Sequence, residues 1–243
     1  MIIDAHVLLG EDPLFRLDVK TLLSLMDEHD IAHAVICPVG RHAAVANREG
    51  NDFIAAAVRH APDRLVGLAA INPWSGPAGV AELRRALAAG LRGLKIHPPL
   101  QGATADDLLW DPLLEVCAGA DVPVLVHSGI FPQSELHAIA ALARRHPRVT
   151  VVAAHMGFTD GWFDLAGAAG AAENLWFETS YIWGDMITNL IGKIGHQRLV
   201  FGSGIPRSDY RTELAKLRRL ELTGEQRDGV MADNARRLWK IRS

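Results

Sequence analysis

The chain is 243 residues long, 49% hydrophobic and 22% charged, with a formal net charge of −3. This balance is typical of a soluble globular protein with ample apolar material for a core, and the length suits a single domain over residues 1–243. The small negative charge predicts neither nucleic acid nor an anionic membrane as partner. No apolar run reaches the ~18 residues of a membrane span, and the first residues lack the basic start of a secretory signal, so a cytoplasmic location is expected.

The chain contains only two cysteines, Cys37 and Cys117, which lie far apart in the sequence. Their spacing matches no zinc-binding or redox motif, so we expect both to be buried apolar side chains. Thiol chemistry is therefore not expected of this protein.

Short apolar runs rich in β-branched residues recur along the chain at a nearly regular interval. Most are continuously apolar and do not alternate, which is typical of strands buried on both faces of a sheet. The predicted strands are residues 2–8, 34–38, 65–71, 93–97, 123–127, 149–155, 175–179 and 198–203.

Amphipathic segments separate these runs and predict helices. Asp18 is placed to cap a helix over residues 19–28, in which apolar residues recur at helical spacing. Thr223 and Gln226 form a capping box for a final helix that ends near Trp239. The other predicted helices are residues 52–60, 78–89, 112–119, 134–146, 162–173, 185–194 and 210–220.

The predicted strands and helices alternate strictly. Such alternation indicates a parallel sheet, and eight strands are the number that closes a barrel. We therefore predict an α/β protein with a (β/α)8 TIM barrel and an extra C-terminal helix. An open doubly wound sheet is the structural alternative, and no linker rich in Ser, Gly or Pro divides the chain.

Polar side chains close most of the predicted strands. Barrel active sites lie at the C-terminal ends of the strands, so we expect these side chains to share one site. Imidazoles close four of the eight strands, which packing alone does not readily explain. The residues are His6, Lys95, His97, His127, His155, Glu178 and Ser203.

Four motifs at these strand ends carry a family resemblance. They are Asp4-Ala5-His6-Val7-Leu8, Val126-His127-Ser128-Gly129, Ala154-His155-Met156-Gly157 and Phe201-Gly202-Ser203-Gly204-Ile205-Pro206. Their order and spacing resemble the amidohydrolase superfamily, in particular its aminocarboxymuconate-semialdehyde-decarboxylase-like branch. Residues 51–73 and the closing segment 234–238 extend the likeness over nearly the whole chain.

Two positions depart from the family pattern. Leu8 stands where the first strand usually has a second histidine, and Gly204 stands where the last strand usually has an aspartate. His6 and Leu8 share one strand face, so the strand offers one ligand and an apolar neighbour. In the family the aspartate binds metal and helps to take the proton from the attacking water, and glycine can do neither. The resemblance thus implies a weakened mononuclear metal site.

Three histidines remain as candidate metal ligands. His6, His127 and His155 could form a three-histidine site with an open position for water, an arrangement known for catalytic zinc, which is the divalent ion we expect. The resemblance also allows His155 a catalytic role in place of a ligand role. Glu178 is a spare catalytic carboxylate if it points inward, and its alternative is a hydrogen-bonded group at the barrel rim.

Lys95 and His97 share a face of the fourth predicted strand. Lys95 could hold a substrate carboxylate, or act as a neutral amine if desolvation lowers its pKa, and a structural ion pair is the alternative. The catalytic candidates are therefore His155, Lys95, His97 and Glu178.

The loops after the strands carry the candidate substrate-binding residues. Arg41 and His42 follow the second strand, Trp183 follows the seventh and Arg207 follows the eighth. Arginine suits a carboxylate, and tryptophan suits the wall of an apolar pocket. A small molecule such as a carboxylate is the expected partner, and the resemblance allows a homodimer.

Three functions remain open from the sequence. The first is an amidohydrolase-like enzyme that hydrolyses a small amide, ester or lactone, or decarboxylates a small unsaturated acid, at the weakened metal site. The second is a metal-independent lyase, isomerase or cyclase, in which freed histidines act as acids and bases and Lys95 polarises a carbonyl. The third is a non-catalytic binding protein that keeps the pocket. The fold cannot choose among them, because function belongs to the site.

Overall fold

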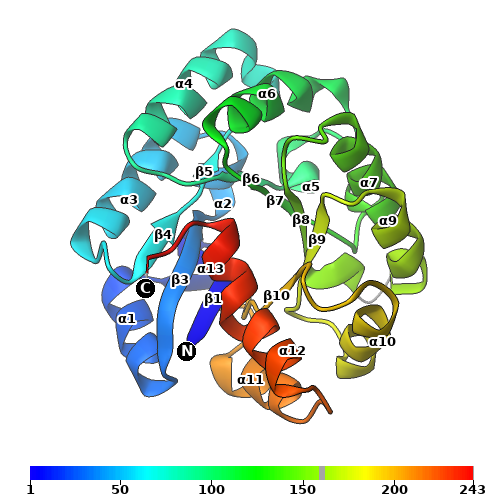
Figure 1. Ribbon diagram of the computed structural model, residues 1–243. Helices are drawn as coiled ribbons and strands as arrows, with labels where there is room; N and C mark the ends of the chain where they lie inside the picture. Colours follow the sequence, from blue (N-terminus) through cyan, green and yellow to red (C-terminus); the bar gives the residue numbers. More distant parts are fainter. Residues whose placement is uncertain (159–161, 243) are drawn as a thin grey trace.

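The computed structural model describes residues 1–158 and 162–242. Its strands form a barrel surrounded by helices (Figure 1). β4 and β5 are one strand interrupted at Leu68. The barrel strands are β1 (Ile2–Asp12), β3 (Ile31–Pro38), β4 (Leu65–Gly67) with β5 (Ala69–Ala70), β6 (Leu94–Ile96), β7 (Val124–His127), β8 (Val151–Ala154), β9 (Leu175–Glu178) and β10 (Leu199–Val200).

Neighbouring strands pair in parallel around the barrel, and backbone hydrogen bonds between the first and last strands close it. The paired strands run β1–β3–β4 and then β5–β6–β7–β8–β9–β10, and backbone hydrogen bonds at Leu68 join the two groups. At the remaining seam, the amide of Ala5 donates to the carbonyl of Phe201 at 2.8 Å, and the amide of Gly204 donates to the carbonyl of His6 at 2.9 Å. The predicted TIM barrel is confirmed, and the open sheet is excluded.

The helices lie outside the strands, as predicted (Figure 1). α1 (Val19–Glu28) has the predicted bounds, and Asp18 caps it by accepting a hydrogen bond from the amide of Thr21. The other long helices overlap their predicted ranges and are α3 (Asn47–His60), α4 (Gly76–Ala88), α6 (Asp111–Ala120), α7 (Leu136–Arg145), α9 (Leu165–Ala171), α10 (Gly184–Ile194) and α11 (Tyr210–Arg218).

The C-terminal helical segment covers one end of the barrel. It starts with α12 (Gly224–Asp228), where Thr223 and Gln226 form the predicted capping box. A π-helical turn then leads into α13 (Asn234–Leu238). Ala235 and Trp239 pack against apolar residues inside the barrel, and Trp239 lies close to Gly93, just before β6 begins. The end where the strands begin is therefore closed, which leaves the C-terminal end for the site.

Three short elements were not expected from the sequence. β2 (Phe15–Leu17) pairs antiparallel with the end of β1 and makes a hairpin there. α2 (Gly40–Ala44) and α5 (Pro98–Gln101) lie in the loops after β3 and β6. All three follow strand ends, so they shape the rim around the site. In the described part of the chain, no helix has both the length and the apolar character needed to cross a bilayer.

Candidate active site

A cavity of about 250 Å³ opens at the C-terminal ends of the strands. Most of its wall is apolar, and it includes Leu8, Phe15 and Phe158. Its polar lining brings together five of the seven predicted strand-end groups, the predicted substrate-binding residue Arg207 and two further residues. It consists of His6, Asp12, Lys95, His97, His127, His155, Tyr181 and Arg207.

The four strand-end histidines form one cluster. The rings of His97 and His127 stack with centroids 4.0 Å apart, His127 lies 5.1 Å from His155, and His155 lies 5.0 Å from His6. Burial lowers the pKa of all four rings because an imidazolium would lose its hydration, and the pKa of His97 falls to about 3. The rings are therefore neutral near pH 7.

An irregularity in β1 directs His6 into the cavity. The pairing of β1 with β3 shifts register between Asp4 and Val7, so His6 and Leu8 both line the cavity while Val7 packs in the outer core. Asp4 Oδ1 accepts hydrogen bonds from the amides of His6 at 3.0 Å and Ser203 at 2.9 Å. Burial raises the pKa of Asp4 to about 7. This carboxyl group therefore holds β1 against the last strand directly beneath the site.

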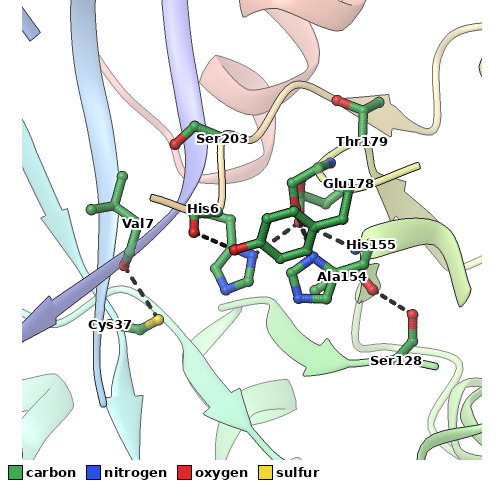
Figure 2. Close-up of polar contacts among 12 residues, drawn as sticks. His6, Val7, Cys37, Ser128, Ala154, His155, Glu178, Thr179 and Ser203 are labelled. Carbon is green, nitrogen blue, oxygen red and sulfur yellow. Dashed lines mark hydrogen bonds and ion pairs between the residues drawn. The ribbon is translucent and has the colours of Figure 1, made fainter. Parts of the chain in front are cut away.

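Glu178 is completely buried and contacts both His6 and His155 (Figure 2). Its Oε2 accepts hydrogen bonds from His6 Nδ1 at 2.9 Å, the amide of His155 at 3.2 Å and Ser180 Oγ at 2.9 Å. Burial raises the pKa of Glu178, and the hydrogen bonds from Ser180 and His155 counteract this rise. A side chain on Gly202 would collide with this carboxylate. Glu178 points inward and does not itself line the cavity.

Lys95 contacts the other side of His6. Its Nζ lies 3.1 Å from His6 Nε2, and the residue is only 3% exposed. Because an ammonium group can only donate, His6 Nε2 accepts and His6 Nδ1 keeps the proton that it donates to Glu178. Desolvation lowers the pKa of Lys95. The result is a buried chain from Lys95 through His6 to Glu178.

Tyr181 is a site residue that the sequence reasoning missed. Its ring stacks on His155 with centroids 4.6 Å apart, and its hydroxyl donates a hydrogen bond to the carbonyl of Gly204. A Cβ atom at Gly204 would lie 2.6 Å from the Tyr181 ring. The signal in the sequence was the run Glu178-Thr179-Ser180-Tyr181, which continues polar past the end of β9.

Backbone strain is concentrated around the cavity. Positive φ is uncommon outside glycine, and such residues often cluster at functional sites. Four non-glycine residues that line the cavity have positive φ, namely Ile130 (70°), His155 (66°), Phe158 (52°) and Tyr181 (62°).

The predicted substrate-binding residues fall into two groups. Arg207 lines the cavity, lies 3.9 Å from Asp12 Oδ2 and covers the ring of Phe15. Arg41, by contrast, pairs with an exposed glutamate at the surface, and Trp183 is 56% exposed. The described residues that line the cavity do not include Arg41, His42 or Trp183.

A protein-family model described as "Amidohydrolase" matches residues 7–241 of the chain. The chain belongs to the amidohydrolase family. The match spans the barrel and the C-terminal helical segment, so it includes the site described above except Asp4 and His6, which precede it.

Several solved structures resemble this amidohydrolase over nearly their full length. A dihydroxybenzoic acid decarboxylase from a Polaromonas species, with bound manganese and 2-nitroresorcinol, has a TM-score of 0.83 at 17% identity and covers 100% of this chain and 98% of its own. A 5-carboxyvanillate decarboxylase from Novosphingobium aromaticivorans is complexed with manganese and 4-hydroxy-3-methoxy-5-nitrobenzoic acid. Its TM-score is 0.82 at 15% sequence identity, and the match covers 99% of this chain and 96% of the decarboxylase. A 2,6-dihydroxybenzoate decarboxylase from Rhizobium has a TM-score of 0.79 at 19% sequence identity, and the match covers 99% of this chain and 98% of the decarboxylase. These likenesses show a shared fold.

One group in the described residues of this amidohydrolase could hold a divalent metal ion. His6, His155 and Glu178 have donor atoms within 4.8 Å of one another. However, His6 Nδ1 and Glu178 Oε2 are already hydrogen-bonded to each other, and His155 Nδ1 lies 2.7 Å from Ser180 Oγ. On the cavity side, His127 Nε2 has no hydrogen-bond partner, but Lys95 occupies His6 Nε2. The donor set therefore does not fit a tightly bound ion without the displacement of these partners.

Proposed function

We propose that this protein is an enzyme that decarboxylates a small unsaturated carboxylic acid with a single ring. The observation that carries the proposal is the floor of the cavity, where Lys95 is buried and no carboxylate of the described residues forms an ion pair with it. A buried cation without a counter-ion is costly. A bound carboxylate would supply the missing charge, and the three solved decarboxylases that share this fold act on aromatic acids of this kind.

The size and polarity of the cavity agree with such a substrate. An apolar cavity of ~150 Å³ is enough to hold benzene, so about 250 Å³ suits one ring with a carboxylate and a small substituent. Arg207 supplies a second positive group on the lining, where it would hold a polar substituent of the ring.

The proposed reaction adds a proton to the ring carbon that bears the carboxylate. The bond from that carbon to the carboxyl group then breaks, carbon dioxide leaves, and the electron pair returns to the ring. Lys95 is the proton donor we propose, because the four histidines are neutral and desolvation makes its ammonium group more acidic than that of a free lysine. His6, itself held by Glu178, holds the lysine from behind, and water that enters the cavity after carbon dioxide leaves returns the proton to Lys95.

Hydrolysis is the second reaction of the family and is less well supported here. The neutral histidines of the cluster could take a proton from the attacking water. However, a neutral amide, ester or lactone would leave the buried Lys95 without a counter-ion. Zinc, a homodimer and a cytoplasmic location remain predictions.

The test is a panel of small aromatic and unsaturated acids, with carbon dioxide release and the product measured. We expect turnover of at least one acid, its loss in Lys95→Met, and its retention in the control Lys193→Met, which removes an exposed lysine on α10. Turnover only of esters, lactones or amides would assign hydrolysis instead. Binding of acids without turnover of any compound would indicate a non-catalytic protein and would refute the proposal.

A further inference from the structure

The position of Lys95 bears on the metal chemistry that family membership implies. Lys95 Nζ lies 3.1 Å from His6 Nε2, the nitrogen that His6 would offer to an ion in the cavity. A divalent ion and an ammonium group cannot share this nitrogen, because the lone pair serves only one of them and the two cations repel. Any ion bound there must first displace a fully buried side chain.

The two replaced ligand positions are filled in this chain. Leu8 lines the cavity as an apolar side chain beside His6. At Gly204 the ring of Tyr181 covers the backbone, and a Cβ atom would lie 2.6 Å from Cζ and the hydroxyl oxygen of Tyr181. Neither position therefore holds a ligand, and at Gly204 the ring of Tyr181 occupies the space.

The remaining donor atoms below the cavity are hydrogen-bonded to one another. Ser180 Oγ donates to Glu178 Oε2, so the proton between His155 and Ser180 belongs to His155 Nδ1. His6 Nδ1 likewise keeps its proton for Glu178. A protonated ring nitrogen cannot bind a metal. His6, His155 and Glu178 could therefore coordinate an ion through these two Nδ1 atoms only after both had lost their protons.

We propose that Lys95 takes the place of the divalent ion in this site: its side chain supplies the positive charge that faces the substrate, and it competes with divalent ions for His6. The statement about the substrate rests on the proposed function, whereas the statement about metal affinity does not.

The test measures divalent metal affinity without any substrate. The full-length wild type, Lys95→Met and the control Lys193→Met are freed of metal with a chelator and titrated with Co²⁺ and Zn²⁺, followed by calorimetry and by the absorption of bound Co²⁺. We expect Lys95→Met to bind at least tenfold more tightly than the wild type and the control. Adding Leu8→His to Lys95→Met restores a second imidazole beside His6 and should raise the affinity further.

Two results would overturn the proposal. One is equal affinity of the wild type and Lys95→Met, whether tight or weak. The other is a stoichiometric ion that the wild type retains through dialysis against a chelator. Circular dichroism checks the fold of each variant, and Lys95→Gln replaces Lys95→Met if the latter does not fold.

Activity gives a separate outcome. If an acid is turned over, a chelator should leave the rate of the wild type unchanged, and loss of activity with recovery on added Mn²⁺ would contradict the substitution of Lys95 for metal. If no acid is turned over, the proposed function fails, and the affinity ratio still decides the role of Lys95 toward metal.

Discussion

The ring of Tyr181 covers Gly204, and the Tyr181 hydroxyl donates a hydrogen bond to the Gly204 carbonyl. The Tyr181 ring also stacks on the ring of His155. A glycine at position 204 is required for this arrangement, both because its φ is 65° and because a Cβ atom would collide with the ring. Gly204, where the family resemblance predicts an aspartate, and Tyr181 therefore form one structural feature.

Restoring the family residue should destabilise the protein. We expect Gly204→Asp to lower the free energy of unfolding by roughly 2–4 kcal/mol, because it adds a strained φ and an overpacked side chain. Tyr181→Ala in the same chain should recover part of that loss by clearing the space. Thermal and urea unfolding measure both effects. Gly224→Asp, in open space in the first turn of α12, is the control and should be nearly neutral; an equal loss at both glycines would contradict the explanation.

The carboxylate of Glu178 should be needed for both stability and function. Glu178→Gln leaves the volume unchanged but turns an amide donor toward groups that already donate, so we expect a loss of roughly 1–3 kcal/mol in unfolding free energy. Any turnover should fall as well, since His6 loses its acceptor. Glu82→Gln, on α4 away from the cavity, should change stability only. Full activity in Glu178→Gln would show that the chain behind Lys95 has no role.

The buried histidines predict a stability that falls in acid. His97 has a pKa of about 3 when folded, against ~6.5 when unfolded. Between these values only the unfolded chain binds the proton, so the free energy of unfolding drops as pH falls, by roughly 1.4 kcal/mol per pH unit for this one group. His6, His127 and His155 act in the same direction because burial lowers their pKa values too.

Asp4 acts in the opposite direction. Its pKa is about 7 when folded and 3.8 in a free side chain, so the folded state gains a proton and is stabilised as pH falls through this range. The four histidines should outweigh it. Urea unfolding between pH 7.5 and 4.5 should show falling stability in the wild type and a shallower fall in His97→Gln. Parallel curves for the two proteins would mean that His97 does not titrate as described.

The two predicted arginines should differ in their effect on a carboxylate substrate. Arg207 lines the cavity, whereas Arg41 pairs with Glu49 at the surface. For any acid that is turned over, or that binds without turnover, Arg207→Met should raise KM or Kd at least tenfold, and Arg41→Met should leave it nearly unchanged. The reverse order would place the anion site in the loop after β3.

The fold could be predicted because its signals are local. Alternation of apolar runs and amphipathic segments, the cap at Asp18 and the capping box at Thr223 all depend on residues a few positions apart. The same local rule predicted that strand-end histidines would meet, since parallel strands present their C-terminal ends on one side. The short elements of the rim escaped prediction because loop conformations depend on packing against other loops.

By itself, the sequence determined a TIM barrel and a cluster of imidazoles at its C-terminal end, and it predicted that Leu8 and Gly204 stand in place of two family metal ligands. Only the tertiary structure decided that Lys95 lies against His6, that Tyr181 covers Gly204 and that Arg207 lines the cavity. The physical reason is that these contacts join different strands and loops. They depend on strand register and on backbone conformations such as the positive φ of Tyr181, which no periodicity along one segment encodes.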